Sequence, residues 1–253
     1  MPVMRSPETT LWAGGATVTI AHRGDVARHR ENTLLGVASA IAEGADVVEI
    51  DVKVTADGEV VLLHDLTLER LWGHSAAITA LTYAAMGELI GGGIGIPRLR
   101  DALGLISGTP CSLLIDMDAA CWAERAVGCV RAGVAEGLVS AGQVLWCGRD
   151  DSLRVVRELD PAARIMLSWD ESNGQGAPPA DDIIEALRPE VYNPHWPMMS
   201  PETVAWARDR GMATCCWTVD DEATMRRMLH FGAKGMITNQ IRTLRKVVDE
   251  LSC

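Results

Sequence analysis

Short apolar runs alternate with amphipathic segments from one end of the chain to the other. The amphipathic segments space their apolar residues as one face of a helix does, for example at Leu34, Val37 and Ile41 ahead of Gly44. The apolar runs have the length of buried strands, and nine are present: residues 18–20, 47–52, 60–64, 112–117, 144–147, 164–169, 190–194, 213–218 and 235–238. Strand–helix repetition of this kind predicts βαβ units around a parallel sheet.

Residues that begin and end helices stand where this alternation requires them. Ser200 and Pro201 provide an N-cap and a first helical position ahead of one amphipathic segment, and Gly211 follows that segment. Asp220 precedes another segment, whose acidic first turn suits the positive end of the helix dipole. The helix boundaries therefore support the same alternation.

The chain length matches one closed barrel of alternating strands and helices. A (β/α)8 TIM barrel takes roughly 250 residues, and this chain has 253, of which 48% are hydrophobic. We therefore predict an α/β fold with a single TIM-barrel domain over residues 1–253. The second and third runs are separated only by residues 55–59, too few for a crossover of ~10 residues or more. These two runs are predicted to form a hairpin through Asp57 and Gly58.

Residues 66–97 interrupt the alternation. They contain Gly91, Gly92 and Gly93 and no good strand. We interpret them as an insertion over the barrel mouth. The alternative is a loosely structured surface loop.

Composition narrows the classes of partner. The formal net charge of −11 argues against nucleic acid, whose binding needs an electropositive face, and against general adhesion to anionic membranes. No run approaches the ~18 apolar residues of a membrane span, and residues 1–8 contain no apolar signal core. The seven cysteines are odd in number and form no CxxC pair, which favours reduced thiols over disulfides or a zinc ribbon. We therefore expect a cytoplasmic protein with a small-molecule substrate, and its oligomeric state is left open.

Ionisable side chains gather at the carboxyl ends of the first apolar runs. His22 follows the first run, Glu49 and Asp51 end the second, and His64 ends the third. Barrel enzymes place their catalytic groups at these strand ends. Residues two apart on a strand share a face, so Glu49 and Asp51 point the same way, and two inward carboxylates are costly unless a cation joins them. An all-oxygen site of this kind suits Mg²⁺ or Ca²⁺ and not zinc.

The next apolar run repeats the arrangement with Asp116 and Asp118. Asp116 lies within apolar sequence, where a solvated charge is hard to explain, and it offers a third oxygen ligand. The alternative is that these acids only cap the helices that follow each strand. The imidazoles of His22 and His64 can exchange protons near neutral pH, and Arg23 can donate two hydrogen bonds to a phosphate. The pattern therefore indicates a cation site with proton-transfer groups and a hydrogen-bond donor for a phosphate.

Five short elements follow one another along the first part of the chain. They are HRG at 22–24, ENT at 31–33, a Glu-x-Asp strand at 49–51, TADG at 55–58 and HD at 64–65. Their order resembles that of the glycerophosphodiester phosphodiesterase family. Later matches to the family are scattered: IPRL at 96–99, LID at 114–116, WTV at 217–219 and GMIT at 235–238. The resemblance covers most of the chain and is most specific before Arg70.

The resemblance implies a TIM barrel with a small insertion after the second histidine. It implies metal-dependent hydrolysis of glycerophosphodiesters to glycerol 3-phosphate and an alcohol, with one divalent cation, Mg²⁺ or Ca²⁺. It also implies roles for particular side chains. His22 and His64 would act as general base and acid, Glu49, Asp51 and Asp116 would hold the cation, Arg23 and Glu31 would form the phosphate site, and Trp217 would line the pocket.

Two motifs depart from the family pattern. Where the family shows Glu-x-Lys, this chain has Asp116-Met117-Asp118, and where the family shows Thr-Asp, it has Thr238-Asn239. An anion at Asp118 that faces a phosphate needs a cation between them, which could be a second metal, a substrate amine, or a Lys or Arg from elsewhere. We expect Asp118 to bind the substrate by selecting a cationic or hydroxyl-rich head group, or to assist the metal through water.

Two other functions are consistent with the same residues. A phospholipase D-like activity on lysophospholipids would use the same site with a more apolar pocket. A non-catalytic barrel would bind a metal or a phosphodiester without turnover; Asp118 favours this alternative and the two intact histidines oppose it. The head group, the choice between Mg²⁺ and Ca²⁺, and attack by water or by a substrate hydroxyl are left open.

Overall fold

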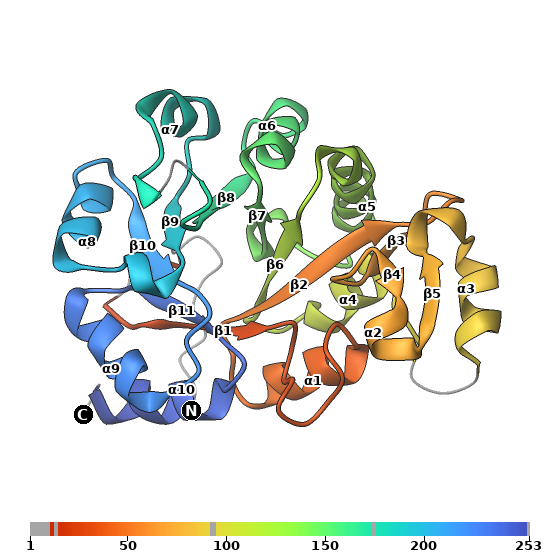
Figure 1. Cartoon of the computed structure of the whole chain (residues 1–253), viewed down its shortest axis with the longest axis horizontal. Coiled ribbons are helices and arrows are strands. Elements are labelled where there is room, and N and C mark those ends of the chain that lie inside the picture. Colours follow the sequence, from red (N-terminus) through yellow and green to blue (C-terminus); the bar gives the residue numbers. More distant parts are fainter. Residues whose placement is uncertain (1–10, 13–14, 92–94, 174–175, 252–253) are drawn as a thin grey trace.

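Eight parallel strands close into a barrel in the computed structural model, which describes residues 11–12, 15–91, 95–173 and 176–251. In order around the ring they are β1 (Val18–His22), β2 (Val47–Val54), β6 (Ser112–Met117), β7 (Val144–Gly148), β8 (Arg164–Trp169), β9 (Val191–Pro194), β10 (Ala213–Cys216) and β11 (Gly235–Thr238) (Figure 1). Pairing of β11 with β1 closes the ring. The predicted TIM barrel is confirmed.

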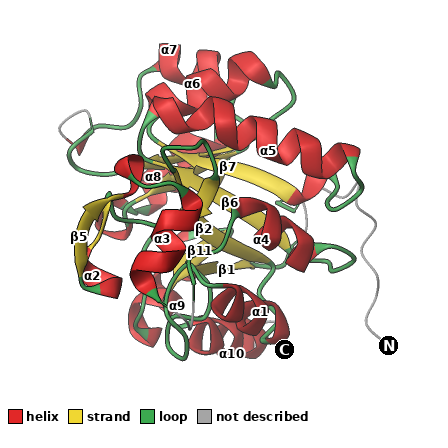
Figure 2. Ribbon diagram, turned by 90° about the vertical axis from the view of Figure 1, so that its right-hand side faces the viewer, coloured by secondary structure: helices red, strands yellow, loops and turns green. Residues whose placement is uncertain are grey.

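A helix follows every barrel strand along the chain. These helices are α1 (Leu34–Ala42), α4 (Leu99–Ile106), α5 (Ala123–Ala135), α6 (Asp150–Leu159), α7 (Asp181–Leu187), α8 (Pro201–Arg208), α9 (Glu222–Phe231) and α10 (Ile241–Leu251). Figure 2 shows the helices around the central strands. Within the described ranges, none of the helices combines the length and the apolar character needed to cross a bilayer.

Local sequence sets where the helices begin. The Ser200 hydroxyl caps α8 by accepting a hydrogen bond from Thr203 N at 3.2 Å, as its position in the sequence predicts. In α9 the cap is Asp221, whose Oδ1 accepts a hydrogen bond from Thr224 N at 2.9 Å. Asp220 precedes this cap by one residue. The carboxylate of Asp220 has other partners, which are described with the site.

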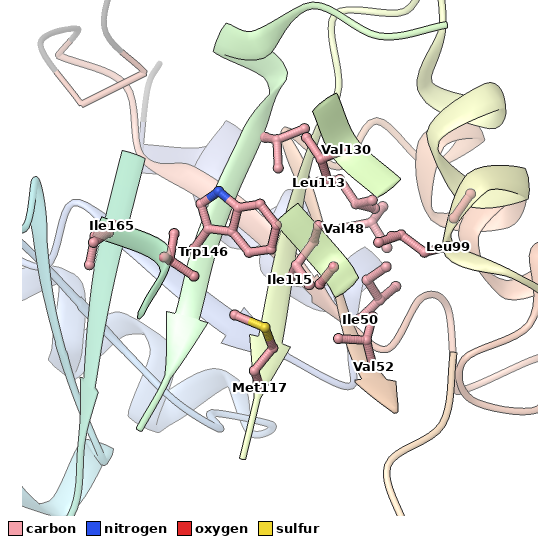
Figure 3. Close-up of a cluster of buried hydrophobic side chains, with 14 of the residues drawn as sticks. Val48, Ile50, Val52, Leu99, Leu113, Ile115, Met117, Val130, Trp146 and Ile165 are labelled. Carbon is pink, nitrogen blue, oxygen red and sulfur yellow. The ribbon is translucent and has the colours of Figure 1, made fainter. Parts of the chain in front are cut away.

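Alternating side chains on the strands form two apolar layers. On β2, Val48, Ile50 and Val52 point outward and belong to the cluster beneath the helices that includes Leu99 of α4 (Figure 3). A second cluster fills the barrel interior and consists of Val18, Ile20, Val47, Leu114, Leu145, Cys147, Met166, Val191, Cys215 and Ile237. Because side chains alternate along a strand, the residues between the outward ones on β2 point into the barrel.

The third apolar run forms β3 (Val60–Leu62), which lies outside the ring and pairs with the end of β2. The pairing is antiparallel and places Val52 opposite Leu62 and Val54 opposite Val60. Gly58 in the connecting turn has φ of +87°, which L side chains rarely adopt. The predicted hairpin through Asp57 and Gly58 is confirmed.

Residues 66–91 and 95–97, the described part of this segment, form a small folded unit. They contain β4 (Thr67–Leu68), α2 (Glu69–Trp72), β5 (His74–Ala77) and α3 (Tyr83–Ile90), and β4 pairs with β5. Leu68, Ile78 and Met86 of this segment are buried in a cluster with Val61 and Leu63 of the hairpin. The loosely structured alternative is therefore wrong, as is the expectation that the segment has no strand. Its two strands are too short and irregular to show a period of two.

Some parts of the sequence interpretation fall outside the described residues, namely residues 1–8, Gly92, Gly93 and Cys253. The other six cysteines are free thiols. The expectation of reduced cysteines is thus confirmed for the part of the chain that the structure describes.

Gly24, which follows β1, lies where the backbone passes so close to Gly36 that no side chain fits. Its φ is +91°, and a Cβ at this position would lie 2.6 Å from the carbonyl carbon of Gly36. Gly24→Ala should therefore lower the free energy of unfolding by about 3 kcal/mol or more, because left-handed strain and the clash add.

Gly211→Ala is the matched control for this substitution. Gly211 also has a positive φ, +78°, but a Cβ there would meet nothing within 4 Å. We expect it to lose only about 1–2 kcal/mol. Urea denaturation measures both losses, and equal losses would contradict the close approach at Gly24.

Candidate active site

A cavity of about 360 Å³ lies among side chains from the carboxyl ends of the barrel strands. Eight of the nine side chains selected from the sequence line it: His22, Arg23, Glu49, Asp51, His64, Asp116, Asp118 and Trp217. The ninth, Glu31, contacts Arg23. A larger hollow of about 430 Å³ beside α4 and α5 is lined by none of these nine residues. The first cavity is therefore the candidate active site.

Three carboxylates in the cavity come from two neighbouring strands. Glu49 and Asp51 lie on β2, and the register of β2 with β6 places Asp116 directly opposite Asp51. Burial raises the pKa of Glu49 well above its usual range, and the negative charges of Asp51 and Asp116 raise it further. Burial and the charge of Asp51 raise the pKa of Asp116 to about 6. In these three residues, the carboxylate trio, burial and mutual repulsion thus both disfavour the ionised state unless a cation compensates.

The loop after β1 contacts the two carboxylates of β2. Arg23 Nε lies 3.1 Å from Asp51 Oδ2, and the backbone N–H of Arg23 donates to Glu49 Oε2 at 2.9 Å. Asn32 Nδ2 donates to Asp51 Oδ2 at 2.7 Å, and Asn32 Oδ1 accepts from Asp51 N at 3.1 Å. Both Arg23 and Asn32 have left-handed backbones, with φ of 56° and 54°. The HRG and ENT elements therefore both contact carboxylates of β2. The sequence did not indicate this role of Asn32.

A chain of ion pairs joins Arg23 to His64. Glu31 Oε1 accepts from Arg23 Nη1 at 3.0 Å, and the same carboxylate accepts two hydrogen bonds from Arg70 at 2.6 and 2.9 Å. Arg70 Nε also donates to Asp65 Oδ2 at 2.6 Å, and the other oxygen of Asp65 lies 2.7 Å from His64 Nδ1. The contact of Glu31 with Arg23 agrees with the orienting role that the resemblance implied. Arg70, from α2, was not selected from the sequence.

Asp220 and Asn239 determine which nitrogen of His22 carries the proton. Asp220 accepts from the backbone N–H of Asn239 and from its Nδ2, both at 2.8 Å. Because the Asn239 amide nitrogen faces this carboxylate, its Oδ1 faces His22 Nδ1, which is 2.8 Å away. The Nδ1–H of His22 therefore donates to Asn239, and Nε2 is left with its lone pair.

Burial favours the neutral form of the His22 ring. It lowers the pKa of His22, and the positive charge of Arg23 lowers the pKa further, against the opposing effects of Asn239, Asp51 and Asp220. His22 Nε2 lies 3.9 Å from Glu49 Oε2, beside the carboxylate trio. A neutral imidazole with a free Nε2 has the properties of a general base.

Lys53 is a site residue that the sequence analysis missed. It follows Asp51 by two positions on β2, so it shares the inward face and lines the cavity. Lys53 Nζ lies 3.1 Å from Asp118 Oδ1, which also accepts a hydrogen bond from Trp122 Nε1 at 3.0 Å. The cation required beside Asp118 is therefore supplied by the neighbouring strand. Period-two spacing from Asp51 would have identified it.

The opposite side of the cavity carries single polar residues at the ends of β8 and β9. Ser168, Asp170 and Asn193 line it together with Trp217. Asn193 Nδ2 donates to Ser168 Oγ at 3.1 Å, and Trp217 Nε1 donates to the backbone oxygen of Asn193 at 3.1 Å. The predicted pocket position of Trp217 agrees with the structure, whereas the three polar residues gave no motif in the sequence.

A family model described as the glycerophosphoryl diester phosphodiesterase family matches residues 22–243. The chain belongs to this family. A glycerophosphodiester phosphodiesterase from Caldanaerobacter subterraneus is 30% identical over 255 residues, covering 92% of this chain and 98% of the relative. The human lysophospholipase D GDPD1 is 22% identical, covering 92% of this chain and 86% of the relative.

Solved structures share the fold. A protein from Silicibacter pomeroyi matches with a TM-score of 0.83 and 23% identity, covering 96% of this chain and 97% of that one. An Oleispira antarctica phosphodiesterase, solved in complex with the product sn-glycerol-3-phosphate, matches with a TM-score of 0.80 and 20% identity, covering 92% and 97%. The barrel of this family member is therefore the family fold over nearly its whole length.

Replacement of Asn239 should change the tautomer of His22. Asn239→Leu removes the acceptor of the Nδ1–H, so the preference for a proton on Nδ1 should be lost while the barrel remains folded. Nitrogen-15 NMR of the imidazole ring measures the tautomer directly. Gln240→Leu, at the exposed neighbouring residue, is the control and should leave the His22 signals unchanged. An unaltered Nδ1–H tautomer in Asn239→Leu would contradict the assignment.

Removal of one carboxylate should stabilise the metal-free protein in a pH-dependent way. The pKa of Asp116 is raised from 3.8 to about 6 in the folded state, so folding takes up a proton between these values and wild-type stability falls as pH rises through this window. Asp116→Asn lacks that loss. In EDTA at pH 8 it should raise the free energy of unfolding by on the order of 3 kcal/mol, and the gain should shrink towards pH 4.

Asp209→Asn provides the control, since Asp209 lies exposed at the end of α8. It should show no comparable gain at either pH. Urea denaturation at pH 4, 6 and 8 measures all three proteins. A gain for Asp116→Asn that did not depend on pH would refute the titration of this group.

Proposed function

We propose that the protein hydrolyses glycerophosphodiesters to glycerol 3-phosphate and an alcohol. The observation that carries the proposal is the geometry of His22: its Nδ1 is bound to Asn239, and its Nε2 lies beside the carboxylate trio in the same cavity as Arg23 and His64. Membership of the glycerophosphoryl diester phosphodiesterase family supports the choice of substrate class.

The carboxylate trio fits one divalent cation. Its donors are all carboxyl oxygens, and burial, together with the neighbouring carboxylates, raises the pKa values of Glu49 and Asp116, an effect that a bound cation would offset. Among the described residues no three His, Cys, Asp or Glu side chains form a preformed metal cage, so the fit rests on the chemistry of the donors. Glu49, Asp51 and Asp116 would hold the ion. When bound, Mg²⁺ or Ca²⁺ polarises phosphoryl oxygens and offsets charge in the transition state.

The positive side chains of the cavity orient the phosphodiester. Arg23 presents a guanidinium whose position is set by Asp51 and Glu31, and Arg70 holds Glu31 from the other side. A planar guanidinium held in this way can donate two parallel hydrogen bonds to one phosphoryl group.

The two histidines move the protons. His22 Nε2 accepts the proton of the attacking hydroxyl, because its Nδ1 is already committed to Asn239. The Nδ1 of His64 faces Asp65, so its Nε2 is the nitrogen that delivers a proton to the departing alkoxide. The attacking hydroxyl belongs to water or to the substrate itself, and a cyclic phosphate intermediate among the products identifies the second case.

A substrate panel tests the proposed function against its two rivals. We expect turnover of glycerophosphocholine, glycerophosphoethanolamine or glycerophosphoglycerol in Mg²⁺ or Ca²⁺, none after exhaustive dialysis against EDTA, and recovery when the ion is returned. Preference for lysophosphatidylcholine would indicate the phospholipase D-like activity instead. Binding of these diesters without turnover in any buffer would indicate a non-catalytic barrel.

Removal of either histidine should abolish most of this activity. His22→Ala and His64→Ala are each expected to lower kcat by about 10²–10⁴-fold, the contribution typical of proton transfer. Thermal unfolding should change little, because both residues line the cavity rather than the apolar layers. His230→Ala, on the exposed side of α9, is the control and should retain full activity. Undiminished turnover in both cavity variants would rule out the mechanism.

A further inference from the structure

Lys53 is buried to an extent that is unusual for a lysine. Its side chain is 2% exposed, whereas Asp118, its ion-pair partner 3.1 Å away, is 53% exposed. Burying an ammonium group is costly, and a carboxylate that remains half in water compensates for it only in part. The buried carboxylate of Asp116 adds an electrostatic contribution, and an anionic substrate group in the cavity would provide a further partner.

The position of Lys53 directs it towards the reacting group. Glu49, Asp51 and Lys53 occupy successive inward positions on β2, and Asp51 is opposite Asp116 on β6. The same register continued by two residues brings Lys53 level with Asp118, one step nearer the barrel mouth than the carboxylate trio. Lys53 thus lines the cavity beside the carboxylate trio and nearer the barrel mouth, where an anionic substrate enters.

The ammonium group of Lys53 has N–H groups that Asp118 does not use. It has three N–H groups. Among the described residues Asp118 is its one ion-pair partner within 4 Å, and the carboxylate of Asp116 acts on it electrostatically from farther away. Asp118 Oδ1 is itself held by Trp122 Nε1, at the end of the 3-10 helix η2 (Ala120–Trp122). The carboxylate therefore fixes the direction of the ammonium group and leaves its other donors to the cavity.

We propose that Lys53 donates hydrogen bonds to the phosphoryl oxygens of the substrate and that Asp118 is the positioning residue that aims it. This inference rests on the proposed function. What matters is the level of the barrel at which the lysine's positive charge lies, and either strand can carry it. The lysine can stand on β2 with the acid on β6, as here, or on β6 with the acid on β2. Asp118 then acts on the substrate through Lys53, a role different from the head-group selection that the sequence suggested.

Binding of the product sn-glycerol 3-phosphate tests the role of Lys53 without relying on turnover. We expect Lys53→Met to weaken its affinity by about 10- to 100-fold, as for loss of a charged hydrogen bond, both in Mg²⁺ and in EDTA. Lys53→Arg, which keeps the charge, should lose less. Calorimetric titration measures each affinity, and thermal unfolding confirms that each variant is folded.

Exchange of the two charges tests the role of Asp118. Asp118→Asn should weaken product binding less than Lys53→Met does, because the ammonium remains but is no longer aimed. The double variant Lys53→Asp/Asp118→Lys should recover affinity to within about tenfold of the wild type, since the ion pair is restored at the same level. An affinity as low as that of Lys53→Met would overturn the equivalence of the two positions.

Lys246→Met is the matched control, because Lys246 is an exposed lysine that also pairs with carboxylates, at 3.7 and 3.8 Å. It should bind the product as the wild type does. Wild-type affinity in Lys53→Met would overturn the role of Lys53 even if the enzyme turns over glycerophosphodiesters. A wild-type protein that binds the product but turns over none of them would contradict the proposed function alone.

Discussion

Three carboxylates inside an apolar barrel are the constraint on which the rest of the site depends. Glu49, Asp51 and Asp116 reach the interior because they occupy inward positions on adjacent parallel strands in register. Burial makes their charges costly, and Arg23 offsets part of that cost through its ion pair with Asp51. The part of that cost that remains is the physical ground for the divalent cation proposed above.

Groups outside the barrel strands orient the polar side chains of the cavity. Asp220, on the connection between β10 and α9, orients His22 through Asn239, so a carboxylate acts on the imidazole without touching it. Arg70, in the folded segment after the hairpin, bridges Glu31 and Asp65. The segment of residues 66–97 is therefore part of the site's architecture, because its first helix supplies the link between the two halves of the ion-pair chain.

The Lys53–Asp118 pair changes how the departure from the family pattern is understood. Asp118 by itself suggests a phosphate site that has lost its cation, which was the main argument for a barrel without catalysis. The ion pair removes that argument, because a lysine on the adjacent strand brings positive charge to the same level of the cavity. The charges at one level of a barrel thus come from neighbouring strands, here β2 and β6. A motif along one strand identifies only the charges on that strand.

The sequence by itself determined the order of strands and helices, the hairpin after β2, and the strand ends that carry the reactive side chains. These features depend on short-range properties: period-two alternation, helix caps and turn residues, which fix the bounds of β6, β8 and β11 without reference to the rest of the chain. Only the tertiary structure decided which charges meet. His22 and Asn239 are 217 residues apart and come together because β11 closes the ring against β1. Lys53 meets Asp118, and Arg70 meets Glu31, through strand register and the packing of a separate segment, and alternation along a strand specifies a face but never the neighbour across it.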